Sequence, residues 1–401
     1  MMNNSKHTLQ SKEVHDLAIK TLLQLSLTAK SDKVQVVDLL NVVLFAAAFR
    51  TSINQACQAL ESAPHPTTVR NQLSEQLSDL DLLEVTINQM LACFLPKKFT
   101  KKGQTIAIDL VDLPYHGDVE PEHEGEVRRS KAKSGTTHFF SYATAYLIHK
   151  GQRYTLAILR VRSDQKMHLV VQRMIERLAQ LRIRVTWYLL DRGFYSVKVM
   201  NLLMEKKFII PVIKKGKKAD SNGDATGTQA FAKIKSSRWE RYTMRNQEGE
   251  SVSFRVAVVC RNFNGKWNRN ERETLLYATN LRWKKKPDWI RKWYRKRFGI
   301  ESSYRQLNQA RIKTSTRKPE LRLLFVAVAL LLRNVWVWLH REVIANRGGG
   351  HRQLIQDVLP LQMVLFWVLH EVLRLYSPRL EIDVSVELQE ALNEHSPFLT
   401  G

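Results

Sequence analysis

Two aspartates stand where predicted strands end, and a carboxylate in that position can reach a ligand. Asp109 lies near the end of an otherwise apolar strand. Asp191 ends a second strand, and the Arg-Gly-Phe that follows turns the chain into a helix. Ser196 is the better cap for that helix, so Asp191 has no evident structural duty. Helix capping or turn formation remains the structural alternative for each aspartate, and Asp112 is a competitor for Asp109.

A third carboxylate, Glu301, lies in a stretch that is expected to be helical over residues 287–310. At helical steps of three and four residues, one face of this helix would carry Tyr294, Arg297, Glu301, Arg305 and Asn308. A stripe that mixes an acid, two arginines, a tyrosine and an amide is not a core stripe. It suits a catalytic acid with phosphate-binding neighbours. A solvated, salt-bridged helix face is the alternative.

These residues resemble the motifs of one enzyme family. Residues 293–308 resemble the Tyr-x2-Arg-x3-Glu-x6-Lys signature of DDE transposases of the insertion-sequence-4 type. Tyr294, Arg297 and Glu301 match it in identity and spacing, whereas Asn308 stands at the lysine position. The Asp-Arg-Gly-Phe-Tyr segment that begins at Asp191 is similar to the family's second-aspartate motif, and Asp109 matches the strand position of the first. The departure at Asn308 concerns a terminal-phosphate contact, not the metal site.

The resemblance implies a ribonuclease H-like fold in which Asp109, Asp191 and Glu301 converge and hold two Mg2+ or Mn2+ ions. Hard, oxygen-preferring ions explain why the ligands are carboxylates. The implied activity is cut-and-paste DNA transposition: metal-dependent cleavage at element ends, then strand transfer into target DNA. Two alternatives stay open, a catalytically inactive DNA-binding descendant and a nuclease of the same fold.

The elements that would position these residues form a mixed α/β core. Strands are expected over residues 105–111, 139–148, 154–161, 185–190 and 208–213, with helices over 167–181 and 197–206. A turn is expected from Asp112 onward, and a solvated hairpin without chemistry over residues 120–133. Residues 217–283 read as an all-β insertion, and the resembled family carries one at that place.

Helical regions flank this core and complete a three-part division. Residues 1–98 are predicted to form a helical domain. Its short helices over residues 52–60 and 67–77 could form a helix-turn-helix that places Thr67, Thr68, Arg70 and Asn71 against DNA, with a plain helical bundle as the alternative. Residues 99–345 form the catalytic domain. Residues 346–401 form a C-terminal helical region that is a candidate for dimerisation. Helices are expected over residues 319–344 and 354–375.

The charge of the chain predicts its partner. The 401 residues carry a net charge of +25, whereas the first hundred residues are neutral and the C-terminal end is acidic, so the excess lies in the middle. Such a field recruits a polyanion, and the partner is predicted to be double-stranded DNA, as element ends and as target. The predicted DNA-binding residues are Arg192, Lys214, Lys215, Tyr294, Arg297, Arg305 and Asn308.

The remaining expectations concern assembly and compartment. A homodimer would hold two element ends in a synaptic complex. Three widely spaced cysteines, Cys57, Cys93 and Cys260, argue against a disulfide framework and suit a reducing cytoplasm. The apolar run over residues 323–332 is about half the length of a membrane span, which indicates a buried helix. We therefore expect a prokaryotic, cytoplasmic, nucleoid-associated protein without a membrane segment.

Overall fold

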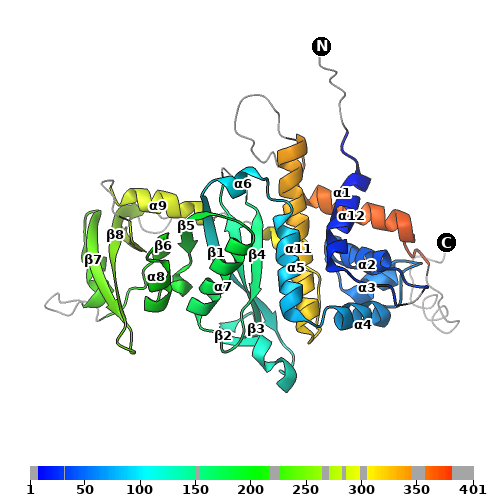
Figure 1. Ribbon diagram of the computed structural model, residues 1–401, viewed down its shortest axis with the longest axis horizontal. Coiled ribbons are helices and arrows are strands. Elements are labelled where there is room, and N and C mark those ends of the chain that lie inside the picture. The colour runs from blue at the N-terminus through cyan, green and yellow to red at the C-terminus, as the bar shows by residue number, and fades with distance from the viewer. Residues whose placement is uncertain are drawn as a thin grey trace, which may run out of the picture.

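The computed structural model describes residues 8–30, 32–149, 153–216, 226–263, 271–281, 286–298, 305–344 and 357–381. These residues form a nine-stranded sheet flanked by helices, with a helical layer at one end of the molecule (Figure 1). The strand order is β2-β3-β1-β5-β6-β9-β8-β7, and β4 pairs with β3. The strands are β1 (Gln104–Tyr115), β2 (Val127–Lys133), β3 (Thr136–Leu147), β4 (Thr155–Arg160), β5 (Val185–Leu190), β6 (Lys207–Pro211), β7 (Arg238–Arg245), β8 (Ser251–Phe263) and β9 (Glu271–Thr279).

The centre of the sheet has the predicted ribonuclease H-like arrangement. Strands β1, β3 and β4 pair antiparallel. Helix α7 (Met167–Gln180) then returns the chain to β5, which pairs parallel with β1. Helix α8 (Val197–Leu203) leads to β6, parallel to β5. Both connections are βαβ crossovers, which place helices against the sheet, and β5 and β6 accordingly read as short apolar runs. The mixed α/β core expected from the sequence is confirmed.

The two faces of the sheet bury different helices. Successive strand residues point to opposite faces, so Ala107, Leu189 and Ile209 share one face. They pack in one cluster with Ile290 and Tyr294 of helix α9 (Asp288–Tyr294). Residues of the other parity join the larger core, to which α7 and α8 contribute. Asp109 and Asp191 have the parity of the α9 face.

Strand β1 is longer than predicted. The turn expected from Asp112 onward is wrong, because β1 continues to Tyr115 and pairs with β3 as far as the Tyr115–His138 pair. Pro114 can sit in this strand because the β5 side of β1 pairs only as far as Ile108. Likewise, residues 120–133 form not one hairpin but the 3-10 helix η2 (Pro121–Glu126) and then β2, which pairs with β3.

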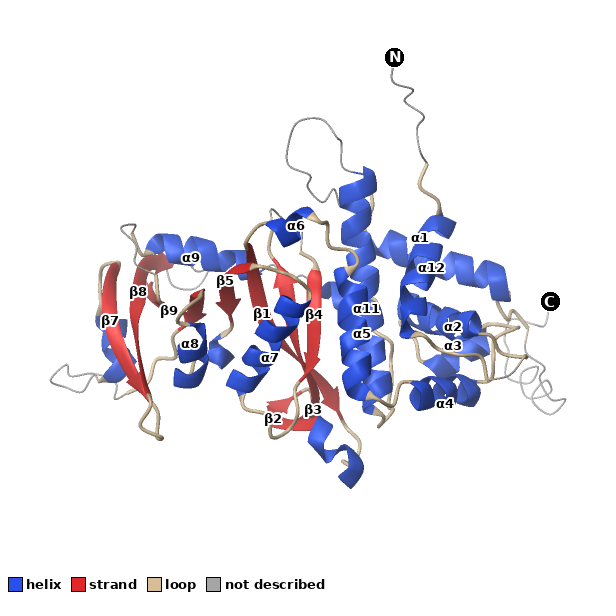
Figure 2. Cartoon of the chain, viewed as in Figure 1, coloured by secondary structure: helices blue, strands red, loops and turns tan. Residues whose placement is uncertain are grey.

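The predicted β insertion continues the core sheet. After the 3-10 helix η4 (Gly227–Lys233), strands β7, β8 and β9 form an antiparallel meander. Strand β9 pairs antiparallel with β6 through Ile210–Ala278 and Pro211–Tyr277. Figure 2 shows this meander at the end of the molecule opposite the helical layer. The insertion therefore stands next to the strand ends of the core.

The N-terminal helices and the C-terminal helix form one layer. The phenol of Tyr376 donates to Asp38 Oδ1 at 2.6 Å, which ties the last helix to the second. Ser11 Oγ donates to Glu371 Oε1 at 2.6 Å. The helices outside the crossovers are α1 (Ser11–Leu22), α2 (Val36–Ala48), α3 (Ile53–Ala59), α4 (Pro66–Gln76), α5 (Leu80–Ala92), the short α6 (Lys98–Lys101), which the sequence did not predict, α11 (Pro319–Leu339) and α12 (Leu361–Tyr376).

Two buried asparagines join this layer to the sheet. Asn88 of α5 accepts from the Ile158 amide at 2.7 Å and donates to the Ile158 carbonyl at 3.0 Å. Asn334 of α11 makes the same pair of bonds with Thr155, at 2.9 and 2.8 Å. The side-chain amides thus serve β4 as a neighbouring strand would, so its edge is satisfied and covered. Helices α5 and α11 lie between the sheet and the other helices (Figure 1).

Helix α11 continues as a π-helical turn, His340–Ile344, and this stretch is long and apolar enough to cross a membrane. Of its most apolar 18-residue window, 94% is buried inside the protein. The expectation of a buried helix over this run is confirmed.

Candidate active site

The parallel pairing of β1 with β5 brings Asp109 beside Asp191. The last pair in this register is Ile108–Leu190, and each aspartate follows one residue later. Both lie at the carboxyl edge of the parallel strands, the edge at which α/β proteins bind ligands. The Asp109 side chain is 13% exposed and that of Asp191 is 48% exposed. One carboxylate is therefore buried and its neighbour is open to solvent.

Arg297 joins the two carboxylates. Its Nη2 lies 2.8 Å from Asp109 Oδ1 and 3.4 Å from Asp191 Oδ1, and its side chain is 8% exposed. Arg297 belongs to the 3-10 turn η5 (Arg295–Phe298), which directly follows α9. A guanidinium offers several donors in one plane, so it can hold two acids at once.

Tyr294 explains how Arg297 reaches this place. Its buried hydroxyl donates to the carbonyl of Leu190 at 3.1 Å, one residue before Asp191. The Tyr294 ring packs against Tyr277 of β9, with 5.2 Å between centroids, and the Arg297 guanidinium lies 5.8 Å from the Tyr294 centroid. Burial raises the pKa of Tyr294 above its usual range, so the phenol stays neutral and keeps its donor. Tyr294 fixes the end of α9 above the end of β5.

The predicted helix over residues 287–310 is interrupted. Helix α9 ends at Tyr294, and the chain tightens into η5. A 3-10 turn has three residues per turn, so Tyr294 and Arg297 still point to the same side. Beyond residues 299–304, the chain is helical over residues 305–307, and both Arg305 and Asn308 are exposed. The prediction of one continuous helix is wrong, and Glu301 lies outside the described residues.

One guanidinium does not offset the burial of Asp109. Burial raises the pKa of Asp109 to about 6, against the lowering effect of Arg297, and the neighbouring charge of Asp191 raises it further. Two adjacent carboxylates carry two negative charges, and one guanidinium balances only one of them, so the pair can bind a further cation. Carboxylate oxygens are the donors that Mg2+ and Mn2+ prefer. The donor set therefore fits the predicted divalent ions.

A cavity of about 860 Å3 opens beside Asp191, the exposed member of this pair. Of the predicted site residues, Asp191, Arg192, Lys214, Tyr294 and Arg297 line it. Lys215 is exposed beside Lys214 without lining the cavity. The opposite wall comes from β6 and β9 and includes two residues that the sequence reasoning did not single out, Glu273 and Tyr277. Glu273 and Tyr277 are an even number of residues apart in β9, so the sequence indicates that they share a face. It does not indicate which strand β9 pairs with, and therefore not that this face lines the cavity.

Asp112 lies on the other face of β1. It accepts from Ser141 Oγ at 2.8 Å, and Lys133 Nζ lies 3.1 Å from its Oδ2. Asp112 thus has structural partners of its own. The geometry brings Asp109, not Asp112, next to Asp191.

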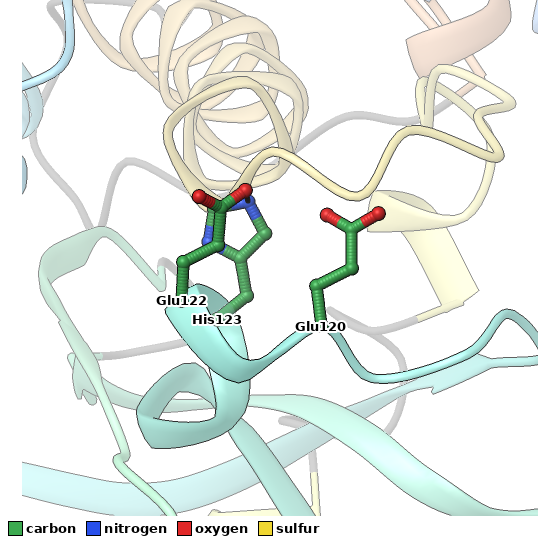
Figure 3. Close-up of side chains that lie close together, drawn as sticks. All are labelled: Glu120, Glu122 and His123. Atoms are coloured by element: carbon green, nitrogen blue, oxygen red, sulfur yellow. Dashed lines mark ion pairs between the residues drawn. The ribbon is translucent and has the colours of Figure 1, made fainter.

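One further acidic group lies apart from this pair. Glu120, Glu122 and His123 on and beside η2 are close enough for their ligand atoms to share an ion, as Figure 3 shows. Arg317 forms an ion pair with Glu120, and His123 Nε2 lies 3.4 Å from Glu122 Oε1. These contacts account for the cluster, so we assign it no metal.

Comparison with known proteins identifies the family. The sequence profile described as "Transposase DDE domain" matches residues 100–335, more than half of the chain. The chain belongs to the transposase DDE domain family. The matched range holds Asp109, Asp191 and Glu301 and ends inside α11. This membership covers the core sheet and the β insertion alike.

A solved structure is also similar to this family member. It is described as "Cryo-EM structure of piggyBac transposase synaptic complex with hairpin DNA", with 11% identity and a TM-score of 0.48. The alignment covers 100% of this chain and 80% of that chain. No curated protein matches the sequence.

Proposed function

We propose that this chain is a DNA transposase of the insertion-sequence-4 type, which cleaves DNA at element ends and transfers the strands into target DNA. The adjacency of Asp109 and Asp191 at the carboxyl edge of β1 and β5 carries this proposal. A pair of carboxylates beside a wide cavity, whose wall includes Asp191 and cationic side chains, suits phosphodiester chemistry.

Asp109, Asp191 and, by the family signature, Glu301 are the residues that would hold two Mg2+ or Mn2+ ions. When bound, such ions would supply activation of an attacking water or 3′-hydroxyl and stabilisation of the leaving oxygen. Displacement at phosphorus needs no covalent intermediate with the protein, so no serine or tyrosine nucleophile is required. Arg297 holds the two aspartates in place, and Tyr294 holds Arg297.

The cavity wall supplies charge for the substrate. Arg192 and Lys214 line the cavity, and both are exposed. Contacts from such side chains to phosphates position DNA without reading its sequence. The proposed DNA-binding set also includes three exposed residues that do not line the cavity. Lys215 follows Lys214 in the sequence, and Arg305 and Asn308 follow Arg297. We place the protein with DNA in a prokaryotic cytoplasm, as a homodimer that holds two element ends.

Glu301→Gln tests this function. Purified protein would be incubated with Mn2+, a target plasmid and a DNA fragment that carries the gene's own flanking sequences. Wild type should cut at the flanks and give joined products, and Glu301→Gln should give neither. Glu205→Gln is the matched control, because Glu205 is an exposed acid after α8, and it should behave as wild type.

Two outcomes would redirect the proposal. Asn308 at the lysine position is the observation that favours a DNA-binding descendant without catalysis, and binding of the flanks without cutting would establish it. Cutting without joined products would indicate a nuclease of the same fold. Full cleavage by Glu301→Gln would remove the active-site assignment.

A further inference from the structure

A second cationic surface lies away from the aspartate pair, where the helical layer meets the sheet. Residues 311–318 run between α4 and the end of β1, with a cavity on either side of about 290 Å3 and 310 Å3. Lys313 and Thr314 line both cavities, so the two adjoin. We call this surface the basic groove and define it by Arg70, His116, Arg311, Lys313, Lys318 and Arg322.

The floor of the basic groove is held by three contacts. The Lys313 amide donates to the Thr51 carbonyl at 3.0 Å, which fastens the segment to the start of α3. Arg322 Nε donates to the Thr316 carbonyl at 2.6 Å. Arg317 pairs with Glu120 on the sheet side. The segment is therefore fixed to both the helical layer and the sheet, and the groove is a preformed surface.

Three cations of the groove have no ion-pair partner in the described part of the chain. Among the residues that the structure describes, no carboxylate forms an ion pair with Arg311, Lys313 or Arg322. Arg322 is 5% exposed, and its guanidinium lies 4.5 Å from the Phe140 ring and 4.9 Å from the Tyr115 ring. Burial and then repulsion from Arg50 lower the pKa of Arg311. An anion in the groove would relieve this accumulation of charge.

Three acids close to the groove already have partners. Glu120 pairs with Arg317, Glu75 pairs with Lys30, and Glu320 accepts from Ser74. The field over the groove is therefore positive, and its ligand should carry several negative charges.

The groove lies on the same sheet face as Asp109. Leu113 lines the second cavity and stands four residues after Asp109 on β1, so the two side chains share a face. At about 3.3 Å per residue, the separation along the strand is roughly 13 Å. One base pair of duplex rises about 3.4 Å, so this separation corresponds to about four base pairs.

We infer that the basic groove binds the sugar–phosphate backbone of duplex DNA, about four base pairs or more from the bond that is cut. The distance from the groove to the cut bond rests on the proposed function of the aspartate pair, whereas the binding of DNA by the groove does not. Arg311 and Lys313 each contact a phosphate, and Arg322 stiffens the wall behind them. Arg70 and the exposed Asn71 present α4 to the same duplex.

The test is the salt dependence of DNA binding by Arg311→Ala/Lys313→Ala. Fluorescence anisotropy with a short DNA duplex, in EDTA, gives the dissociation constant at several salt concentrations. Each lost phosphate contact should reduce the slope of log affinity against log salt by about 1, so the double variant should lose about 2. The loss should be the same for flanking and scrambled sequences, because phosphates carry no sequence information.

The matched control is Lys12→Ala/Lys20→Ala. It also removes two exposed charges, from α1, which lies on the far side of α2 from α4 (Figure 1). It should keep the wild-type slope, and all proteins should show the same melting curve. An unchanged slope in the groove variant, or an equal loss in the control, overturns the inference. A loss with an RNA duplex but not with DNA overturns it as well. Arg70→Ala is a second variant, expected to lose about one unit of slope.

The two proposals fail separately. If wild type does not cut DNA in Mn2+ but the groove variant loses its slope, the groove stands and the proposed activity fails. If wild type cuts DNA and the groove variant binds as wild type does, the activity stands and the groove fails.

Discussion

Asp109 lies beside Asp191 because Ile108 pairs with Leu190 in the parallel register of β1 and β5. The two aspartates are 82 residues apart in the chain, yet each is the residue after the last shared pair. A shift of one residue in this register would turn one carboxylate to the opposite face. The site therefore depends on the packing that fixes the register, including the apolar cluster under α9.

Asp109→Asn should abolish metal-dependent DNA cleavage, whereas Asp112→Asn should not. Asp109 faces the site beside Asp191, and Asp112 bonds to Ser141 and Lys133 on the other face. Loss of a carboxylate ligand should cost several kcal/mol of transition-state stabilisation, about a thousandfold in rate. The measurement is the initial rate of flank cleavage in Mn2+. The assignment would be reversed if Asp109→Asn cleaved at the wild-type rate, or if Asp112→Asn folded well but did not cleave.

Asp109→Asn should also be more stable than wild type at neutral pH when EDTA is present. The folded pKa of Asp109 is about 6, above the ordinary value of 3.8. An acid with a raised pKa contributes stability that is complete below its unfolded pKa and is lost as pH rises through the folded pKa. The total is on the order of 3 kcal/mol. Urea unfolding of both proteins at about pH 5 and about pH 8 should show a gap that grows with pH. A constant gap would contradict the raised pKa.

Arg297→Gln should destabilise the metal-free protein by about 3 kcal/mol. The substitution leaves Asp109 buried beside Asp191 without its cation, and removal of one partner of a buried pair is costly. Thermal unfolding in EDTA gives the change. Arg238→Gln is the control, since its pair with Glu240 is largely exposed and should matter by less than 1 kcal/mol. Equal effects of the two substitutions would mean that Arg297 does not hold the aspartates.

Asn308→Lys should strengthen DNA binding. Asn308 is exposed, one position after the buried Leu307, and it stands where the family signature has lysine. One added phosphate contact should steepen the slope of log affinity against log salt by about 0.9. Anisotropy titrations in EDTA would compare it with Asn308→Gln, which adds length without charge. No difference between the two variants would show that position 308 does not reach the DNA.

The sequence was sufficient for the local elements of this fold. Periodicity located the short apolar strands β5 and β6 and the amphipathic helices α7 and α5, because each of these patterns depends only on near neighbours. It failed where a distant partner decides the outcome. Strand β1 runs past Asp112 because β3 pairs with it, and the helix after Pro287 tightens at Arg295, where the chain meets the ends of β1 and β5.

The same division holds for the site. Residue types and spacing, together with the resemblance to a family signature, selected Asp109, Asp191, Tyr294 and Arg297 from the sequence. Only the tertiary structure decided that Arg297 bridges the two aspartates, that Asp112 faces away, and that residues 311–318 form a groove with α4. These relationships join residues far apart in the sequence. Strand register and helix packing fix them, and neither is encoded in any local pattern.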